Sequence, residues 1–401
     1  MKTSIKNKVS VIGMIVLWIL GHSISGQQGE FIVSASQKND FKEYKNHETT
    51  GHSRFVAQSR SEYAQWLDSN AQQFKAFKNR IYKDWGVYNA SSNKQWVEYG
   101  KEAKSCSIVD FATVIVTVEV LSKPIGTAKT VVKRKLEEAI ENVLTSKGNL
   151  TEVPTQPRDS AVCALVKPVL TNQVVNADGQ IITPKNINTF AQQTVENSII
   201  TSALTADSSN EKYVVKFFLA PDHLIRRMTP FIPLVKKYCL KYDLNPAHVL
   251  ALIHTESYFN PMARSSENAI GLMQLVPEKG AREAMEFINN AAVEIPRAEY
   301  LYDPETNIEL GCVYLYILKA RIFGEVANKE CCMYCSIAGY NTGPANVAYA
   351  FTGARKLEPA ILAINSMNDP GRVYDRLIHN LPAIETRFYL ENVIERSRLY
   401  Q

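Results

Sequence analysis

Residues 246–257 read Pro-Ala-His-Val-Leu-Ala-Leu-Ile-His-Thr-Glu-Ser, an apolar run that ends at a single carboxylate, Glu256. Pro246 suits the first turn of a helix, because a backbone N–H at that position would have no partner within the helix. Leu252 and Ile253 give the run an apolar face, which favours a buried helix. The sequence therefore predicts that Glu256 ends a buried helix, where desolvation raises the pKa of a carboxyl group toward neutral pH.

The segments around this run carry helical patterns as well. Every segment after Asp222 has apolar residues at helical spacing. Besides the run above, the expected helices span 230–242, 307–323, 332–340 and 385–400. We therefore expect residues 221–401 to form an all-helical domain. His254, within one turn of Glu256, is expected to face away from it.

Residues 61–220 mix two patterns, which favours a small α+β domain. Apolar residues recur at helical spacing over 62–85 and again over 127–144. Residues 114–120 alternate valine with other residues, as one face of a strand does, and 213–219 indicates a second strand. Strands this few cannot build a wound parallel sheet. The predicted fold class is therefore α+β, with a small α+β domain followed by the helical domain.

The N-terminus has the pattern of a targeting segment. Three lysines precede an apolar run over residues 9–20, and small residues precede a cleavage site at Gly26. This pattern predicts a secretory signal peptide over 1–25. A retained membrane anchor is the alternative, although the run is shorter than the ~20 residues that span a bilayer. Residues 26–60 are polar and lack a period, which indicates a flexible lead-in. We expect export to the periplasm or cell envelope.

Composition limits the classes of anchor and partner. No cysteine lies between Val9 and Phe31, so the sequence predicts export without a lipid-bearing N-terminal cysteine. The formal net charge of +5 is small for a chain of 401 residues, and lysines of the predicted signal peptide account for part of it. A basic surface of the kind that binds nucleic acid is therefore not expected. The hydrophobic share of 45% is typical of a globular protein.

Seven cysteines give an odd number, so in an exported chain at least one thiol is unpaired or pairs with another chain. Cys331, Cys332 and Cys335 lie just before Tyr340, and Cys312 lies on the preceding predicted helix. A zinc site is the less favoured interpretation, because no second ligand pair stands at a recognisable spacing from Cys332 and Cys335. The pattern favours buried small apolar residues on a helix, or a disulfide to Cys312, over such a site.

Several motifs of the helical half occur in a fixed order. They are Glu256-Ser257-x-Phe259-Asn260-Pro261-x-Ala263, Gly271-Leu272-Met273-Gln274 and Tyr340-Asn341. Residues 303–311 and 381–390 extend the match. Together these motifs resemble the signature of the soluble-lytic-transglycosylase family, from about Leu219 to the C-terminus. Gly339 departs from the family pattern, which usually has alanine before the Tyr-Asn pair.

The N-terminal half carries a looser likeness. Its motifs are Phe77-x-x-x-Ile81-x-x-x-Trp85-Gly86, Trp96-Val97-x-Tyr99 and Val109-Asp110-Phe111. They are similar to the N-terminal domain of a membrane-bound branch of the same family. Members of that branch are lipid-anchored. Because this chain has no cysteine at the corresponding place, we do not expect it to share that anchor.

The resemblance implies a goose-lysozyme-like fold for the helical domain and an enzyme that cleaves the β-1,4 bond between N-acetylmuramic acid and N-acetylglucosamine. It implies that Glu256 is the catalytic acid and base, and that further residues bind the substrate. These are Ser257, Met273, Gln274, Tyr340, Asn341 and Tyr389. The implied partner is a glycan strand of peptidoglycan, bound by a monomer in peripheral association with the envelope. Neither a metal nor a cofactor is expected.

Cleavage of a glycosidic bond needs an acid at the leaving oxygen, and most glycosidases add a second carboxylate. The nearest candidates in sequence are Glu267, Glu278, Glu283 and Asp303, each in a polar context, and the sequence leaves open whether one folds back. With Glu256 alone, the C6 hydroxyl of the sugar can attack C1 and give a 1,6-anhydromuramoyl product, a reaction of cell-wall turnover. A lysozyme-type hydrolase and a non-catalytic peptidoglycan-binding module are the alternatives.

Overall fold

The computed structural model describes residues 72–123, 129–148, 167–198, 201–204 and 210–401, together with Gln65 and Ser69. The predicted signal peptide and lead-in, residues 1–60, lie outside the described residues. Contacts group Asp68–Gln401 into one compact unit. The domain boundary expected at residue 220 stays a prediction.

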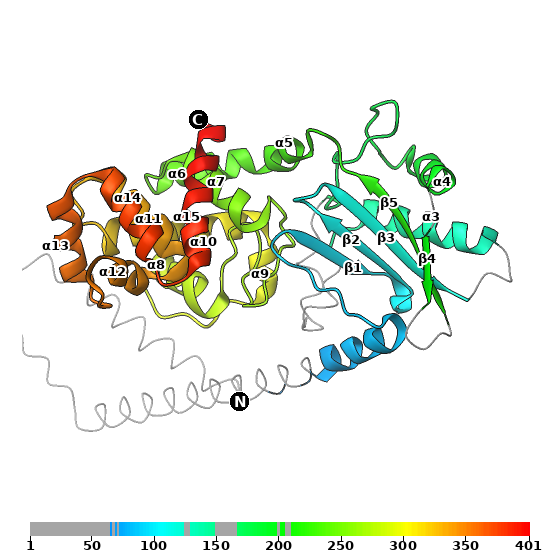
Figure 1. The fold of residues 1–401 in the computed structure, drawn as a ribbon, viewed down its shortest axis with the longest axis horizontal. Helices are drawn as coiled ribbons and strands as arrows, with labels where there is room; N and C mark the ends of the chain where they lie inside the picture. Colours follow the sequence, from blue (N-terminus) through cyan, green and yellow to red (C-terminus); the bar gives the residue numbers. More distant parts are fainter. Residues whose placement is uncertain are drawn as a thin grey trace, which may run out of the picture. The chain divides into compact units, whose positions relative to one another are not determined.

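A five-stranded antiparallel sheet forms the first half of this unit, in the order β1-β2-β3-β5-β4 (Figure 1). Its strands are β1 (Gln95–Tyr99), β2 (Ser105–Asp110), β3 (Ile115–Ser122), β4 (Thr201–Leu204) and β5 (Glu211–Phe218). The pairing of β3 with β5 begins with Ile115 opposite Phe218 and ends with Ser122 opposite Glu211. Val114, which was expected within the strand, lies in the turn before it with a φ of 60°.

The sheet has two apolar faces because successive side chains of a strand point to opposite sides. One face, which includes Val118, packs against α3 (Lys129–Thr145) and α4 (Ile187–Asn197). The other face, which includes Leu121, packs against the helical segment over 72–85. Helices on both sides therefore cover the sheet.

From His223 onward, the elements of the described chain are helices joined by loops. The α-helices are α5 (His223–Met228), α6 (Ile232–Lys241), α7 (Pro246–Ser257), α8 (Arg282–Asn289), α9 (Ala298–Tyr302), α10 (Pro304–Ile317), α11 (Lys329–Thr342), α12 (Pro344–Thr352), α13 (Leu357–Met367), α14 (Pro370–Asn380) and α15 (Ile384–Ser397). Shorter 3₁₀ and π-helical turns of this half are η3 (Thr229–Phe231), η4 (Pro277–Ala281), η5 (Leu318–Ile322) and η6 (Arg398–Tyr400), and another, η1 (Lys101–Ala103), lies between β1 and β2. The predicted α+β class, with a helical second half, is confirmed.

Helix α7 packs against both α6 and α15 within this half. The side chain of Asn245 caps its N-terminus, since the amide oxygen accepts a hydrogen bond from the backbone N–H of Ala247 at 2.9 Å. The helix ends at Ser257, because Tyr258 and Phe259 adopt left-handed φ values of 50° and 58°. The predicted carboxylate, Glu256, therefore lies in the last turn of a buried helix.

Arg227 of α5 joins the sheet to the helices. Its guanidinium group lies 4.1 Å from the centre of the Phe111 ring and donates a hydrogen bond of 2.9 Å to Oε1 of Gln173. Only 4% of Arg227 is exposed, and burial lowers its pKa to about 9. The side chain is therefore still charged near neutral pH.

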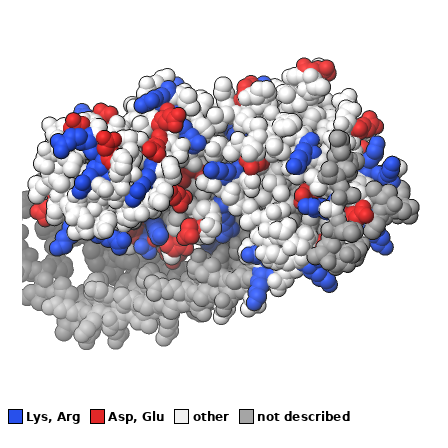
Figure 2. All heavy atoms as spheres, viewed as in Figure 1, with Lys and Arg blue, Asp and Glu red and all other residues white. Residues whose placement is uncertain are grey.

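The surface of the helical half carries charges of both signs. Figure 2 shows basic and acidic side chains intermixed over the helical part of the face drawn. Among the described residues, no helix combines the length and the apolar character needed to cross a membrane.

Candidate active site

The carboxyl group of Glu256 is enclosed by protein atoms although part of the residue stays accessible to solvent. Burial raises the pKa of this carboxyl from its ordinary 4.5 to about 8; contact with the Tyr389 hydroxyl lowers the pKa, and the charge of Glu385 raises it further. The pKa and the partial accessibility are compatible, because a carboxyl can be surrounded on most sides and still meet a substrate on one. Glu256 is therefore mostly protonated at neutral pH.

Two buried phenols, Tyr340 and Tyr389, face this carboxyl. Burial raises the pKa of each well above its usual value, and the charge of Glu256 adds to the effect. The hydroxyl of Tyr340 donates a hydrogen bond of 2.9 Å to the carbonyl oxygen of Met273. The hydroxyl of Tyr389 contacts Glu256, yet it has no partner in aligned hydrogen-bond geometry within the described part of the chain. Both phenols are neutral, so neither can act as a base here.

A second carboxylate, Glu385, comes near the site from the first turn of α15. Its side chain is exposed to solvent. This residue was not among the acidic residues that the sequence suggested. The signal that could have found it was present, because Glu385 lies inside the motif over 381–390 that also contributes Tyr389.

The four acidic residues considered from the sequence do not act on Glu256. None of Glu267, Glu278, Glu283 and Asp303 is among the charges that shift its pKa. Asp303 instead caps α10, where its carboxylate accepts a hydrogen bond of 2.8 Å from the backbone N–H of Thr306. None of the four is therefore a second carboxylate of the site, since all are exposed and Asp303 caps a helix.

The motif Gly271-Leu272-Met273-Gln274 forms a tight loop beside α7. Ile270 and Leu275 close it with two backbone hydrogen bonds of 3.0 Å each. Gly271 has a φ of 79°, and a Cβ there would lie 2.4 Å from the carbonyl oxygen of Leu301, so glycine is required. The loop brings the predicted residues Met273 and Gln274 to the same region as Glu256.

Three predicted substrate-binding side chains point into the protein and not toward open solvent. Ser257 is fully buried, and its hydroxyl donates at 2.7 Å to the carbonyl oxygen of Leu272. Met273 is fully buried as well. Gln274 donates from Nε2 to the carbonyl oxygen of Gly271 at 2.9 Å and to that of Ala263 at 3.2 Å. These bonds tie the loop to α7 and to itself.

Asn341 is the predicted site residue with an exposed side chain. Its Oδ1 accepts a hydrogen bond of 2.8 Å from the hydroxyl of Thr386. This bond joins the end of α11 to the start of α15, next to Glu385.

His254 does not face the carboxyl of Glu256. Its Nδ1 lies 2.8 Å from the hydroxyl of Tyr400, and its ring stacks on Phe259 with 5.8 Å between centres. Burial, and then the charge of Arg396, lower the pKa of His254 to about 3. The imidazole is therefore neutral and belongs to the packing of α7 against the C-terminal turn.

Thiols of the helical half do not form disulfides. Cys239, Cys312, Cys331, Cys332 and Cys335 are all buried and free. Cys312 contacts the thiol of Cys239 on α6, not the cysteines of α11. The interpretation of a disulfide to Cys312 is therefore wrong, and the structure supports small buried residues. Among the described residues, no group of three or more His, Cys, Asp or Glu side chains could hold a metal ion.

Known proteins match both halves of the described chain. The Transglycosylase SLT domain matches residues 233–362, and the N-terminal domain of membrane-bound lytic murein transglycosylase C matches residues 61–229. A membrane-bound lytic murein transglycosylase C from Pectobacterium atrosepticum is 30% identical over 330 residues, which cover 81% of this chain and 88% of the relative. The protein of the same name from Edwardsiella ictaluri is 29% identical over 330 residues, with the same coverage.

Solved structures of soluble lytic transglycosylases match a smaller part of the chain. The 70 kDa enzyme from Escherichia coli is 26% identical with a TM-score of 0.33, over 45% of this chain and 25% of that one. An inactive E503Q mutant of the enzyme from Pseudomonas aeruginosa is 25% identical with a TM-score of 0.32, over 42% and 23%. The chain spans about a quarter of the length of these two proteins. The likeness to the curated relatives over most of the chain, and both matching domain models, show that the chain belongs to the family of membrane-bound lytic murein transglycosylase C.

Proposed function

We propose that this peptidoglycan lytic transglycosylase cleaves the β-1,4 bond between N-acetylmuramic acid and N-acetylglucosamine and leaves a 1,6-anhydromuramoyl end. The observation that carries the proposal is the enclosed carboxyl of Glu256, whose pKa of about 8 keeps it protonated at neutral pH. A protonated carboxyl that a substrate can still reach is what a general acid requires.

Glu256 acts twice in the proposed reaction. It first gives its proton to the bridging oxygen, and the bond from that oxygen to C1 of the muramic residue breaks. The ionised carboxylate then takes the proton of the C6 hydroxyl while O6 bonds to C1, which closes the anhydro ring and restores the protonated acid. The acetamido group of the sugar stabilises the positive charge at C1 between these steps, as it does in substrate-assisted glycosidases.

The two phenols support the acid in different ways. Tyr389 has a hydroxyl without an aligned partner among the described residues, so it is available to donate to the Glu256 carboxylate when the proton has left. Tyr340 is already bonded to the carbonyl oxygen of Met273 and so fixes the wall of the site. Tyr389 would stabilise the ionised intermediate, and Tyr340 would hold the geometry.

The other predicted residues divide by exposure into one that can contact the substrate directly and three that cannot. Asn341 offers an accessible amide to a sugar hydroxyl or acetamido group. Ser257, Met273 and Gln274 are buried, so we propose that they act on the substrate by shaping the loop over 271–274. A non-catalytic binding module would need Asn341 and this loop but not Glu256.

The hydrolase alternative has a candidate for its second catalytic group, Glu385. A lysozyme-type enzyme needs a second group to activate water, and Glu385 is the carboxylate whose charge reaches Glu256. Its exposed position at the start of α15 leaves it hydrated. We propose that its charge helps to keep Glu256 protonated, with the C6 hydroxyl as the nucleophile.

Product analysis tests this function directly. Purified sacculi are digested with the wild-type protein and with Glu256→Gln, and the soluble products are weighed by mass spectrometry. An anhydro end is one water lighter than a hydrolysed end. Digests dominated by reducing muramic acid would reject transglycosylation. If these reducing products then disappeared in Glu385→Gln, Glu385 would be identified as the base that activates water. Release of products by Glu256→Gln at the wild-type rate would reject the acid itself.

An envelope location agrees with the relatives, which are named membrane-bound. We propose that the protein acts there as a monomer on glycan strands, in peripheral contact with the envelope and in the turnover of the cell wall. Export by a cleaved signal and the lack of an acylated cysteine concern residues 1–31, which lie outside the described residues. Both stay predictions from the sequence, and the mass of the mature N-terminal peptide would test them.

A further inference from the structure

The side chain of Asn307, on α10, makes three hydrogen bonds, two of them to the loop over 270–274 and one to α9. Its Oδ1 accepts the backbone N–H of Met273 at 2.8 Å. Its Nδ2 donates to the carbonyl oxygen of Ile270 at 2.9 Å and to that of Leu301 at 2.7 Å. Asn307 is only 1% exposed. One amide therefore satisfies three buried backbone groups, two of them in the loop.

The loop passes this constraint on to the catalytic groups. The carbonyl oxygen of Leu272 accepts the hydroxyl of Ser257, the residue next to Glu256. The carbonyl oxygen of Met273 accepts the hydroxyl of Tyr340. The N–H of Met273 is held by Asn307 while its carbonyl holds Tyr340, so a shift of this one residue would move both sides of the site.

Further residues on the same face of α10 fit the same loop. Gly311 lies one turn after Asn307, and a Cβ there would come within 2.3 Å of Sδ and 2.9 Å of Cβ of Met273. Tyr314 lies nearly one turn further, and its ring centre is 5.3 Å from that of Tyr340. Positions three and four apart on a helix share a face. This face of α10 therefore touches the loop through Asn307 and Gly311 and the phenol through Tyr314.

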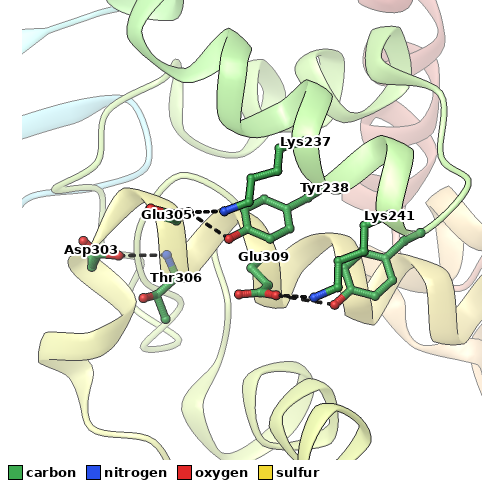
Figure 3. A network of polar contacts seen from close by, with 8 residues as sticks. Lys237, Tyr238, Lys241, Asp303, Glu305, Thr306 and Glu309 are labelled. Atoms are coloured by element: carbon green, nitrogen blue, oxygen red, sulfur yellow. Dashed lines mark hydrogen bonds and ion pairs between the residues drawn. The ribbon is translucent and has the colours of Figure 1, made fainter.

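The opposite face of α10 is clamped to α6 by a two-step ladder, which Figure 3 shows. Lys237 and Tyr238 donate to Oε1 of Glu305 at 2.7 and 3.0 Å. One turn along, Lys241 donates at 2.9 Å to Oε1 of Glu309. Asn307 stands between the two glutamates in sequence and on the buried side of the helix. The ladder thus anchors the helix from which Asn307 reaches the loop.

We propose that Asn307 is a positioning residue of the active site, which acts through the loop over 270–274 to hold Glu256 and Tyr340 in their working arrangement. The inference rests on the proposed function, in which Glu256 is the acid. Only an uncharged amide fits the three bonds. An aspartate would keep the acceptor for Met273 but lose both donors and place a charge against two carbonyl oxygens.

The first test compares Asn307→Asp with wild-type protein on soluble glycan strands. A misplacement of about 1 Å can cost roughly 100-fold in rate, so kcat should fall by about that factor. KM should change by less than about three-fold, because the interaction lost is one that the transition state needs most. Assays are run at a temperature at which circular dichroism shows both proteins fully folded.

The pH profile separates positioning from simple loss of stability. The variant changes both the water and the charge around Glu256, so the alkaline limb of kcat should move from its wild-type position. The groups that face Glu256, namely Tyr340, Tyr389 and Glu385, are unchanged in this comparison. A merely structural role would lower the folded fraction and leave that limb in place. Loss of all activity in Glu256→Gln, measured alongside, tests the proposed function independently.

Asn365 provides a matched control. Its amide also bridges a loop, donating to the carbonyl oxygen of Glu325 at 2.8 Å and accepting the N–H of Ala327 at 2.9 Å. Asn365→Asp introduces the same chemistry away from the site and should keep the wild-type kcat and alkaline limb. Wild-type kcat and limb in folded Asn307→Asp would overturn the inference, and so would an equal loss in the Asn365 variant.

A second pair of variants keeps the inference testable if Asn307→Asp does not fold. Gly311→Ala pushes against Met273, so kcat should fall, and adding Met273→Ala should restore part of the loss because the methionine side chain no longer fills that space. An additive double variant, or a Gly311→Ala protein with wild-type kcat, would show that this face of α10 does not position the loop.

Discussion

Glu256 acquires its chemistry from its place in α7. The carboxyl lies in the last turn of a buried helix, where burial removes water from the charged form. The negative end of a helix dipole also opposes a carboxylate at this position. Two neutral phenols and the charge of Glu385 complete the surroundings. Glu256 therefore keeps its proton at neutral pH, which the proposed role as general acid requires.

Replacing the acid by its amide is the direct test at this scale. Glu256→Gln keeps the shape but can neither give nor take a proton, so activity on glycan strands should fall by at least about 10²–10⁴-fold, the usual contribution of general acid-base catalysis. The native state binds the Glu256 proton more tightly than the unfolded chain does. As the pH rises from 4.5 toward 8, the carboxyl ionises in the unfolded chain but not in the native state, and this lowers the free energy of unfolding of the wild type. Glu256→Gln should therefore melt at a higher temperature than wild type at neutral pH, and the difference should shrink toward pH 4.5.

The pH dependence of the rate gives a second prediction. Because the proposed reaction begins with protonated Glu256, kcat/KM should fall as the pH rises through about 8. Glu385→Gln removes a charge that raises the pKa of Glu256, so the alkaline limb should move to lower pH. A titration of initial rates in buffers of constant ionic strength measures both. An unmoved limb in Glu385→Gln would show that the two carboxylates do not interact.

The sequence named candidate site residues but not the directions of their side chains. Glu256 and Tyr389 could be proposed because their motifs are specific. The sequence could not show that Ser257 and Gln274 use their polar groups on backbone carbonyls, since that depends on where the loop over 271–274 lies. Glu385 was missed because its approach to Glu256 depends on how α15 packs on α7.

At the scale of the elements, two ion pairs hold α10 against α6. Each step of the ladder is an ion pair with a phenol beside it, and most of its charged atoms are exposed. Exposed ion pairs contribute little to stability, so the ladder fixes how the helices lie more than it holds the fold together. Its second step is the better shielded, because 27% of the Glu309 side chain is exposed against 50% of that of Glu305.

A substitution at the ladder should therefore be mild. Glu309→Gln should lower the free energy of unfolding by about 1 kcal/mol or less, the range of partly exposed pairs. The effect should weaken further at high salt. Chemical denaturation at two salt concentrations measures it. A loss several times larger would mean that the ladder, and not the buried face of α10, carries the stability of this helix pair.

Buried thiols on neighbouring helices give a further test at this scale. Burial raises the pKa of Cys332. The hydrogen bond with the Cys239 thiol, and then burial, raise the pKa of Cys312 well above normal, and burial, with the thiols of α11, does the same for Cys335. Thiolates are the reactive form, so these three cysteines should resist alkylation in the native protein and react after unfolding. Peptide mass spectrometry before and after denaturant resolves each site. Rapid native labelling of Cys312 would contradict the packing of α6 on α10.

Element boundaries were predicted less well than the elements themselves. The helix expected from residue 307 begins at Pro304, because Asp303 caps it and proline suits its first turn. Strands β1 and β2 were not predicted, since neither is long enough to show a clear alternation. Their existence depends on pairing with β3, which no local pattern reveals.

At the scale of the whole unit, neutral histidines lie where the sheet and helices meet the C-terminal turn. His223 contacts the buried Arg227, which lies on Phe111 of the sheet half. His254 contacts Tyr400. The motif Pro221-Asp222-His223 marked this connection in the sequence, but the partners of Arg227 are far away along the chain. The sequence therefore predicted a link without predicting what it packs against.

These histidines should make the fold sensitive to mild acid. Burial, with the charge of Arg227, lowers the pKa of His223 to about 4, and burial, with the charge of Arg396, lowers that of His254 to about 3. The unfolded chain takes up these protons near pH 6.5, so the free energy of unfolding should fall as the pH drops from 6.5 toward 4. The stability lost in this window is fully present above pH 6.5.

His254→Asn separates this contribution from that of the carboxylates. The asparagine amide can still pair with the Tyr400 hydroxyl that His254 contacts, but the side chain cannot become charged. Urea unfolding at pH 7 and pH 5 should show a smaller loss of stability in this variant than in wild type. His379→Asn, at an exposed position on α14, is the control and should keep the wild-type difference. An equal loss of stability in wild type and His254→Asn would mean that protonation of other groups, and not of His254, destabilises the fold in mild acid.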